Sequence, residues 1–239
     1  MKGVTEIWGH RGASAYAPEC TLPAFELALE QGADGLEFDV QLTRDDQVVV
    51  IHDETLERTT DGTGWVADHS LADLRALDAS AGMAGFAGTG IPTLDEVLEL
   101  AGGVTLNIEL KNSRMRYKGL EERVLQIVAD HGVGDRVVLS SFNHYSLRHL
   151  MQLGAPYPLG ALYSDPLFQP WKYARRLGVT CLHPPLRATR RKLVENCHAL
   201  GMRVHVWTVN DVPDLERMAG LGVDAVITNN PDVARSVVG

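Results

Sequence analysis

The amino-acid sequence predicts an α/β fold that closes into a barrel, and three observations support this fold class. Helix-like stretches repeatedly end on a glycine, and an apolar strand follows within a few residues. Segments with strand character are about as numerous as the strands of a closed eight-stranded barrel. The chain has 239 residues, a length that suits one barrel with a substantial core. We therefore expect residues 1–239 to form a single domain.

The repeated unit is marked by six glycines. Each one follows a helix-like stretch and precedes an apolar strand. They are Gly32, Gly132, Gly154, Gly178, Gly201 and Gly222. Parallel strands need long crossover connections, which are usually helices. The repeated order of helix, glycine and strand therefore predicts a parallel sheet wrapped by helices.

Helix starts are also marked in the sequence. Side chains that can accept hydrogen bonds from the first turn precede three helix-like stretches, and a proline or an acidic residue follows in that turn. These pairs are Thr21 with Pro23, Ser70 with Asp73, and Thr93 with Glu96. The capping signals agree with the helical segments that the glycines delimit.

The strand candidates number one more than an eight-stranded barrel holds. They lie near residues 5–9, 34–40, 48–51, 104–110, 136–140, 158–162, 179–182, 203–207 and 224–228. The extra member is 48–51, because the segment 43–47 before it is long enough for a hairpin and too short for a crossover helix. We predict an antiparallel arm there and a TIM (β/α)8 barrel built from the other eight strands.

The segment 53–90 departs from this rhythm. It carries a turn-rich stretch at 59–64, one short helix near 70–77, and glycines at positions 82, 85, 88 and 90. We expect a small insertion between the second and third barrel βα units that caps the barrel mouth.

Composition limits the possible partners and setting. The net charge is −9 and the pI is near 5.4, which argues against nucleic acid as a partner. The three cysteines lack the paired spacing of a zinc or redox motif, as expected for a reducing cytoplasm. No apolar span reaches membrane length, and the chain starts without a secretory signal pattern. We expect a cytoplasmic protein with no integral membrane segment.

Three acidic residues are expected to share a site. Glu37 and Asp39 are two residues apart on one predicted strand, so both side chains leave the same face. Glu109 ends a later strand and is followed at the same spacing by Lys111. Converging carboxylates repel one another unless they keep a proton or bind a cation, and oxygen ligands favour Mg²⁺ or Ca²⁺. One acidic pair alone would more simply be a solvated strand face or salt bridge.

Two histidines lie next to the same strand ends. His10 precedes Arg11 and a glycine that permits a tight turn, and His52 precedes Asp53. Imidazoles move protons near neutral pH, while a guanidinium and an ammonium neutralise phosphate. This set of side chains suits the cleavage of a phosphodiester. The other seven histidines are expected at the surface or in packing positions.

The chain contains a series of short motifs, in the same order along the sequence, that resemble those of the glycerophosphodiester phosphodiesterase family. The resemblance covers nearly the whole chain. These motifs are His10-Arg11-Gly12, Pro18-Glu19-x-Thr21-Leu22, Glu37-x-Asp39-Val40, Thr43-x-Asp45, Val49-Val50-x-His52-Asp53, Arg58-Thr59-Thr60, Ile91-Pro92-Thr93-Leu94, Asn107-Ile108-Glu109-Leu110-Lys111, Ser140-Ser141-Phe142 and Trp207-Thr208-Val209-Asn210. The resemblance implies a TIM barrel with a small insertion, and hydrolysis of glycerophosphodiesters to glycerol 3-phosphate and an alcohol.

The resemblance also implies a role for each matching residue. It assigns Glu37, Asp39 and Glu109 to one divalent cation, His10 and His52 to acid-base catalysis, and Arg11 and Lys111 to the substrate phosphate. We hypothesise that the glycerol 2-hydroxyl attacks phosphorus, so that a cyclic glycerol phosphate forms before water opens it.

Two residues depart from the family pattern, and one aromatic residue has an uncertain place. Cys20 stands where the family usually has asparagine, and Asn229 stands where it usually has aspartate. We expect neither difference to touch the core chemistry. Trp207 could stack on the substrate at the barrel mouth, although a large aromatic residue on a strand is as often part of the core.

Three alternatives to the glycerophosphodiesterase stay open. One is a lysophospholipase D acting on single-chain lipids, which an exposed apolar groove would favour. Another is a metal-dependent hydrolase or isomerase of a different barrel lineage, which imidazole metal ligands would favour. The last is a catalytically silent phosphodiester-binding protein. The sequence leaves the alcohol head group, the physiological metal and the oligomeric state undecided.

Overall fold

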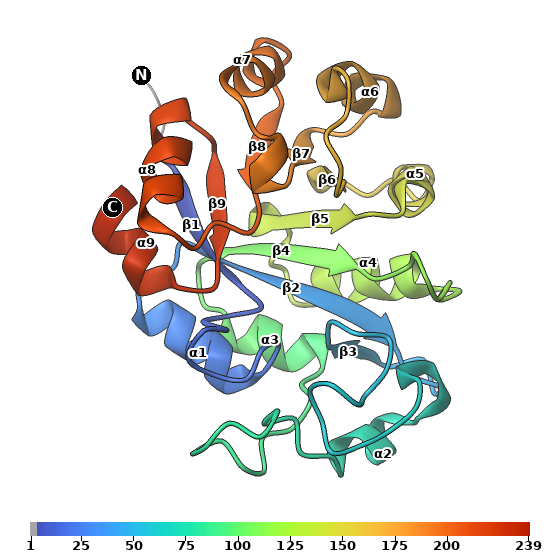
Figure 1. Cartoon of the computed structure of the whole chain (residues 1–239). Coiled ribbons are helices and arrows are strands. Elements are labelled where there is room, and N and C mark those ends of the chain that lie inside the picture. Colours follow the sequence, from blue (N-terminus) through green and yellow to red (C-terminus); the bar gives the residue numbers. More distant parts are fainter. Residues whose placement is uncertain (1–3) are drawn as a thin grey trace.

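The computed structural model describes residues 4–239 and forms the predicted barrel (Figure 1). Its ring consists of β1 (Glu6–His10), β2 (Gly35–Leu42), β4 (Thr105–Leu110), β5 (Val137–Ser141), β6 (Leu159–Leu162), β7 (Cys181–His183), β8 (Arg203–Val206) and β9 (Ala225–Thr228). Neighbouring strands in the ring pair in parallel, and β1 pairs with both β9 and β2, which closes it. The TIM-barrel prediction is confirmed, with strand ends within two residues of those expected.

The predicted antiparallel arm is β3 (Val48–Val50), which lies outside the ring. It pairs with β2 in the register Val40 to Val50 and Leu42 to Val48. Ile51 continues the contact, since its amide donates to the Asp39 carbonyl at 3.1 Å. The hairpin therefore returns the chain toward the acidic residues of β2.

Helices cover the outside of the ring. They are α1 (Leu22–Glu30), α3 (Leu94–Leu100), α4 (Leu120–Asp130), α5 (His144–Gln152), α6 (Pro170–Leu177), α7 (Arg191–Ala199), α8 (Val212–Leu221) and α9 (Pro231–Val238). The short helix α2 (Leu71–Arg75) lies in the insertion beside β3 instead (Figure 1). Thr21 caps α1, while Ser70 and Thr93 form capping boxes at α2 and α3. The predicted helix starts are confirmed, and all six marker glycines adopt positive φ.

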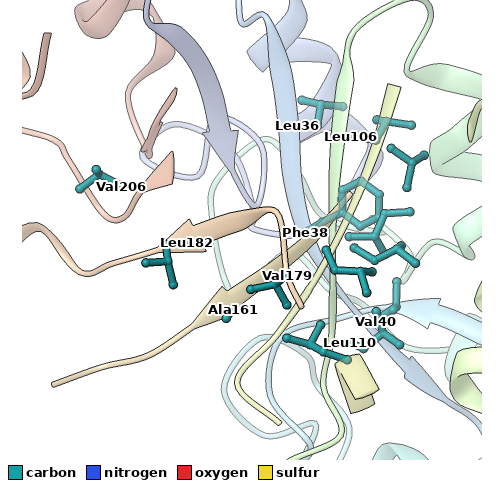
Figure 2. Close-up of a cluster of buried hydrophobic side chains, with 14 of the residues drawn as sticks. Leu36, Phe38, Val40, Leu106, Leu110, Ala161, Val179, Leu182 and Val206 are labelled. Atoms are coloured by element: carbon teal, nitrogen blue, oxygen red, sulfur yellow. The ribbon is translucent and has the colours of Figure 1, made fainter. Parts of the chain in front are cut away.

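The apolar core fills the layer between strands and helices (Figure 2). Phe38 and Leu110 are fully buried there, and the Phe38 ring packs edge-on against Phe25 of α1 at 5.5 Å between centroids. Side chains alternate between the two faces of a strand, so the residues on either side of Phe38 point into the barrel. The outward apolar positions of β2 thus fix Glu37 and Asp39 on the inner face.

The barrel interior below the site is closed by a layer of rings from β1, β7 and β8. His183 and His205 are buried and share a hydrogen bond at 2.9 Å, and the Trp8 ring lies 4.4 Å from that of His205. Burial lowers the pKa of His183 to about 3, so the imidazole stays neutral. Both histidines take packing positions, as expected.

The segment between β3 and α3 holds a short 3-10 helix at Val66–Asp68 and the helix α2. Together with Val49 of β3, its apolar side chains form a small cluster that is separate from the main core. The cluster contains Val49, Ile51, Leu56, Val66, Leu74, Ala79 and Ile91. Within residues 4–239, no helix is both long and apolar enough to cross a membrane.

Candidate active site

A pocket of about 210 Å³ lies at the carboxyl ends of the barrel strands. It is lined by His10, Arg11, Glu37, Asp39, His52, Asn107, Glu109, Phe142, Leu162, Trp207 and Ile227. Seven of the eight predicted site residues are in this lining. The eighth, Lys111, contacts two of the carboxylates. Residues from distant parts of the chain therefore meet at one place, as the strand-end positions predicted.

The three carboxylates converge because of strand register. Glu37 and Asp39 share the inner face of β2, and Asp39 lies opposite Glu109 in the pairing of β2 with β4. All three side chains are buried, with 1 to 6 % of their surface exposed. One oxygen from each lies within 4.8 Å of the others, close enough to hold one metal ion. The cluster consists of carboxylates alone, with no imidazole ligand.

Burial and mutual repulsion both shift the pKa values of the three carboxyl groups. Burial and the neighbouring charge of Asp39 raise the pKa of Glu37 well above its usual range and that of Glu109 to about 7. Burial also acts to raise the pKa of Asp39, but the positive charge of Lys111 and other neighbours lowers it. A bound cation would relieve this repulsion and let all three groups ionise.

Two further contacts fit a cation at the same place. The Lys111 ammonium lies 3.2 Å from Glu109 Oε1 and 3.4 Å from Asp39 Oδ1. Among the described residues, Asp39 Oδ1 is buried and accepts no hydrogen bond of good geometry. An unsatisfied buried carboxylate oxygen is costly, so the site is suited to a positively charged ligand.

The Arg11 guanidinium lies beside the carboxylates. Arg11 has φ of +56°, and its amide donates to the Glu37 carbonyl at 2.7 Å. Its Nη1 donates to Glu19 at 2.8 Å, while its Nε lies 3.6 Å from Asp39 Oδ2. The turn requires Gly12, because a Cβ there would lie 2.6 Å from the backbone of Ala24. The glycine thus lets the first strand turn sharply beside the pocket.

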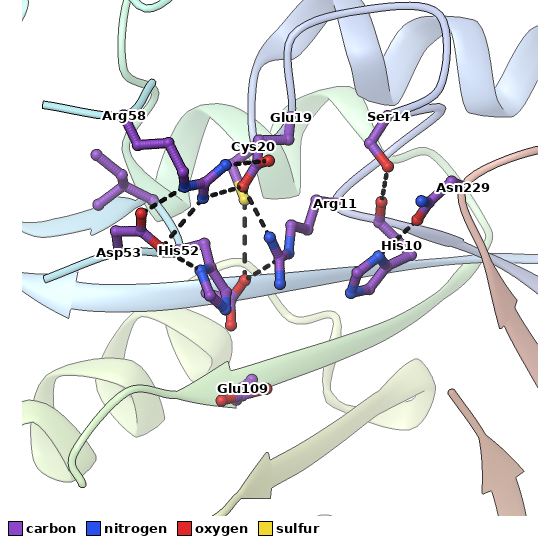
Figure 3. Close-up of polar contacts among 12 residues, drawn as sticks. His10, Arg11, Ser14, Glu19, Cys20, His52, Asp53, Arg58, Glu109 and Asn229 are labelled. Atoms are coloured by element: carbon purple, nitrogen blue, oxygen red, sulfur yellow. Dashed lines mark hydrogen bonds and ion pairs between the residues drawn. The ribbon is translucent and has the colours of Figure 1, made fainter. Parts of the chain in front are cut away.

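His10 is held by a neutral amide (Figure 3). Its Nδ1 lies 2.7 Å from Asn229 Oδ1, and its Nε2 lies 4.0 Å from Glu37 Oε2. An amide oxygen can only accept, so the proton belongs on Nδ1 and the lone pair on Nε2. Burial and the nearby Arg11 lower the pKa of His10 to about 4. The expectation that Asn229 stays clear of the chemistry was wrong.

His52 is held instead by a carboxylate that belongs to a network of charged side chains. Its Nδ1 lies 2.6 Å from Asp53 Oδ1, and Arg58 donates to both oxygens of Asp53. Arg58 also donates to both oxygens of Glu19 at 2.8 Å, and Glu19 in turn holds Arg11 (Figure 3). The hydrogen bonds from Arg58 lower the pKa of Asp53 to about 2. The insertion therefore reaches the site through Arg58.

Gln41 fixes the backbone that carries His52. This fully buried side chain continues the inner face of β2, two residues after Asp39. Its Nε2 donates to the carbonyls of residues 51, 52 and 53 at 2.8 to 3.1 Å. Its Oε1 accepts from the Tyr117 hydroxyl at 2.6 Å. Gln41 was not among the residues predicted from the sequence, although the alternating polar positions 37, 39 and 41 were a visible signal.

Cys20 also reaches the site, contrary to the expectation from sequence. Its φ is +57°, and its Sγ donates to Asp39 Oδ2 at 3.9 Å. Burial and the charge of Asp39 raise the pKa of the thiol well above its usual range, so it stays protonated. The smaller thiol thus makes a weak contact with one of the carboxylates.

Trp207 forms part of the pocket wall. Its indole Nε1 donates to the His183 carbonyl at 2.8 Å, and its ring meets Phe142 edge-on at 5.5 Å between centroids. One edge is therefore anchored in the barrel while another part of the ring lines the pocket. Phe142 completes this apolar wall, although the sequence predicted no role for it beyond its place in the Ser140-Ser141-Phe142 motif.

Comparison with known proteins agrees with this arrangement. Residues 10–233 match the model of the glycerophosphoryl diester phosphodiesterase family. A glycerophosphodiester phosphodiesterase from Caldanaerobacter subterraneus is 43% identical over 98% of both chains. One from Bacillus altitudinis is 40% identical over 97% of both chains.

Solved structures show the same fold. A phosphodiesterase from Oleispira antarctica, solved with the product sn-glycerol-3-phosphate, has a TM-score of 0.89 and 32% identity, covering 98% of this chain and 97% of that one. A putative glycerophosphoryl diester phosphodiesterase from Silicibacter pomeroyi has a TM-score of 0.92 and 27% identity, covering 100% of this chain and 94% of the other. From its matched motifs, its barrel and these relatives, the chain belongs to the glycerophosphoryl diester phosphodiesterase family.

Proposed function

We propose that this protein hydrolyses glycerophosphodiesters to glycerol 3-phosphate and an alcohol, with one divalent cation, Mg²⁺ or Ca²⁺. The observation that carries the proposal is the meeting of three carboxylates, two histidines and two cationic side chains in and around one small pocket. Relatives that bear this activity in their names cover nearly the whole chain, which supports the same assignment.

Glu37, Asp39 and Glu109 are the residues that would hold the cation. All three offer oxygen atoms, which suit a hard ion, and their mutual repulsion favours its binding. The bound ion would draw in the phosphate and make a bound hydroxyl more acidic. We assign Arg11 and Lys111 to the negative charge on the phosphate oxygens.

The two histidines would move the protons. In the first step the glycerol 2-hydroxyl attacks phosphorus, one histidine takes its proton, and the bond to the alcohol breaks as the other histidine protonates the leaving oxygen. In the second step water opens the cyclic phosphate with the roles reversed. Each proton lost by a nucleophile is thus returned to a leaving oxygen. Trp207 would lie against the substrate as part of the apolar wall.

The insertion, the cellular location and the partners complete the proposed function. Arg58 links the insertion to Glu19 and Asp53, which supports treating residues 53–90 as part of the active-site region of a single domain. Whether that insertion caps the barrel mouth stays a prediction, as does the cytoplasmic location. The substrate is a small molecule, and the strongly acidic composition supports the expectation that nucleic acid is not a partner.

The first experiment measures release of glycerol 3-phosphate from glycerophosphocholine and glycerophosphoethanolamine. After chelation, activity should vanish and return with Mg²⁺ or Ca²⁺. Glu37→Gln should abolish the restored activity, whereas Glu99→Gln on the exposed side of α3 should keep it. Substrate binding without release under every ion would contradict the proposal and favour a silent binding protein.

A second substrate separates the cyclic pathway from direct attack by water. An analogue with hydrogen in place of the hydroxyl next to the phosphoester lacks the internal nucleophile. We expect it to bind and to turn over poorly. Turnover as fast as that of glycerophosphocholine would overturn the cyclic intermediate while leaving the hydrolysis itself in place.

A further inference from the structure

Lys111 is followed by a buried residue that fixes the end of its strand. The Lys111 ammonium lies beside Glu109 and Asp39, just past the end of β4. The next residue, Asn112, has only 2% of its surface exposed. A buried amide needs hydrogen-bond partners for its polar atoms. The partners of Asn112 therefore decide where the chain turns away from the barrel and how Lys111 is presented to the carboxylates.

Asn112 finds these partners on two helices and in the loops around it. Its Nδ2 donates to Glu121 Oε1 of α4 at 2.9 Å and to Ser146 Oγ of α5 at 3.4 Å. Its backbone carbonyl accepts from Asn143 Nδ2 at 2.5 Å, and its Oδ1 accepts from the Tyr117 amide at 2.7 Å. Glu121 and Ser146 are themselves buried and share a hydrogen bond. Asn112 is thus held from four directions.

Tyr117 carries the connection from Asn112 to the arm. Tyr117 is buried, and its hydroxyl donates to Gln41 Oε1 at 2.6 Å. Burial raises the pKa of the Tyr117 hydroxyl, so it keeps the proton that it donates. The other end of the same amide, Gln41 Nε2, donates to the backbone carbonyl of His52 at 3.1 Å. The orientation of the Gln41 amide is therefore fixed from both sides.

These contacts form a continuous set that we call the buried bridge, made of Asn112, Tyr117 and Gln41. It begins at the residue after Lys111 and ends on the backbone of His52. Buried polar networks whose members are satisfied are rigid. The phosphate-binding ammonium and the imidazole would act in the same transition state, where a displacement of about 1 Å can cost about 10²-fold in rate. A rigid connection between them therefore has catalytic value.

We propose that Asn112 and Tyr117 are positioning residues that hold Lys111 and His52 in one fixed arrangement through the buried bridge. This rests on the proposed function, which gives Lys111 the substrate phosphate and His52 a proton transfer. Asn112 and Tyr117 lie outside the lining of the catalytic pocket, so they act through the residues that they hold. The loop between β4 and α4 thereby becomes part of the catalytic arrangement.

The first test removes one hydroxyl. Tyr117→Phe leaves Gln41 Oε1 without its donor and should lower kcat for glycerophosphocholine about tenfold, a part of the full acid-base contribution, with little change in KM. Tyr163→Phe is the matched control, because Tyr163 is also buried and its hydroxyl has no partner among the described residues. The control should keep kcat within about twofold of wild type.

A second background separates positioning from a general loss of structure. In the His52→Ala protein the positioned group is absent, so adding Tyr117→Phe should lower kcat by less than about twofold. An equal loss in both backgrounds would overturn the proposal and leave Tyr117 as a residue that supports only the fold. Unchanged kcat of Tyr117→Phe in the otherwise wild-type protein would overturn it too.

Asn112→Leu cuts the buried bridge at its other end. Leucine has a similar volume but can neither donate nor accept a hydrogen bond. We expect kcat/KM to fall about tenfold or more, and part of this loss should disappear in a Lys111→Ala or a His52→Ala background. A loss that persists unchanged in His52→Ala would confine Asn112 to Lys111 and overturn the coupling. If Asn112→Leu does not fold, Tyr117→Phe decides the proposal.

A readout without turnover keeps this inference apart from the proposed function. NMR of protein with isotope-labelled histidine reports on the His52 ring, whose signals are identified by their loss in His52→Ala. These signals should move in Tyr117→Phe and stay in place in Tyr163→Phe. Moved signals in a protein that hydrolyses no glycerophosphodiester would support the buried bridge and correct the proposed function. Unmoved signals in an active enzyme would overturn the bridge alone.

Discussion

The two histidines of the pocket are held in opposite ways. His10 ends a barrel strand and rests on the neutral amide of Asn229, which follows another barrel strand. His52 follows an arm outside the ring and rests on the carboxylate of Asp53, itself neutralised by Arg58. One side of the site is therefore built from the barrel, whereas the other is assembled from side-chain contacts around the arm.

This difference has an electrostatic consequence. Burial lowers the pKa of both histidines, and at His10 the charge of Arg11 lowers it further. The hydrogen bond to Asn229 and the charge of Asp39 oppose the lowering at His10. At His52 the charge of Asp39 and the hydrogen bond to Asp53 oppose it, while the charges of Lys111 and Arg11 add to it. The barrel side thus favours a neutral imidazole that accepts a proton, while the arm side better tolerates an imidazolium that donates one. The comparison predicts His10 as base and His52 as acid in the first step.

The largest expected effects come from removing either histidine. His10→Ala and His52→Ala should each lower kcat for glycerophosphocholine about 10²–10⁴-fold, because general acid-base help is lost. His149→Ala, on the exposed side of α5, serves as the control. Steady-state kinetics at saturating cation measures both losses. A histidine whose variant keeps nearly full activity has no place in the proton transfers.

A smaller effect is expected from Gln41, which acts on the arm side alone. Gln41→Met leaves buried carbonyls of residues 51 to 53 without their donor, which should lower the free energy of unfolding by about 1–3 kcal/mol. Because His52 loses its fixed backbone, kcat should fall about tenfold, a part of the full acid-base contribution, with little change in KM.

Urea unfolding and steady-state kinetics measure the two effects of Gln41→Met separately. Gln126→Met, on the exposed side of α4, controls for the substitution itself. A loss of stability with unchanged kcat would mean that Gln41 supports the fold without positioning His52.

The smallest effect is expected from giving His10 a carboxylate partner, as His52 has in Asp53. Asn229→Asp places a negative charge next to His10 Nδ1, which stabilises the imidazolium and raises its pKa. Since the base must be unprotonated, the acid limb of the pH profile of kcat/KM should move to higher pH by about one unit. Activity above that limb should persist. An unmoved limb, with Asn196→Asp on α7 as the charge control, would remove His10 from the role of base.

Local signals in the sequence were sufficient for most of the fold. The caps at Thr21, Ser70 and Thr93 and the glycines after six of the helices depend on residues a few positions apart. They can therefore be recognised without a structure. The arm was predictable because a short connection excludes a parallel crossover. The carboxylate cluster followed from the alternation of side chains along a strand.

The supporting contacts of the site could not be predicted in the same way. Asn229 reaches His10 from 219 positions along the chain, and Arg58 reaches Glu19 from 39 positions away. Such pairs depend on how the barrel closes and how the insertion folds back, and neither leaves a periodic pattern in the sequence. For the same reason the contacts of Cys20 with Asp39 and of Asn229 with His10 were not expected from the sequence.

The position of β3 outside the ring has a consequence for divergence among related genes. The barrel closes through the pairing of β1 with β2, so its hydrogen-bonded ring does not include the arm. A descendant that altered the arm could keep the barrel, the three carboxylates and His10 while losing the second proton-transfer group. In this architecture, an enzyme could give rise to a receptor for its former substrate by changes confined to one appendage.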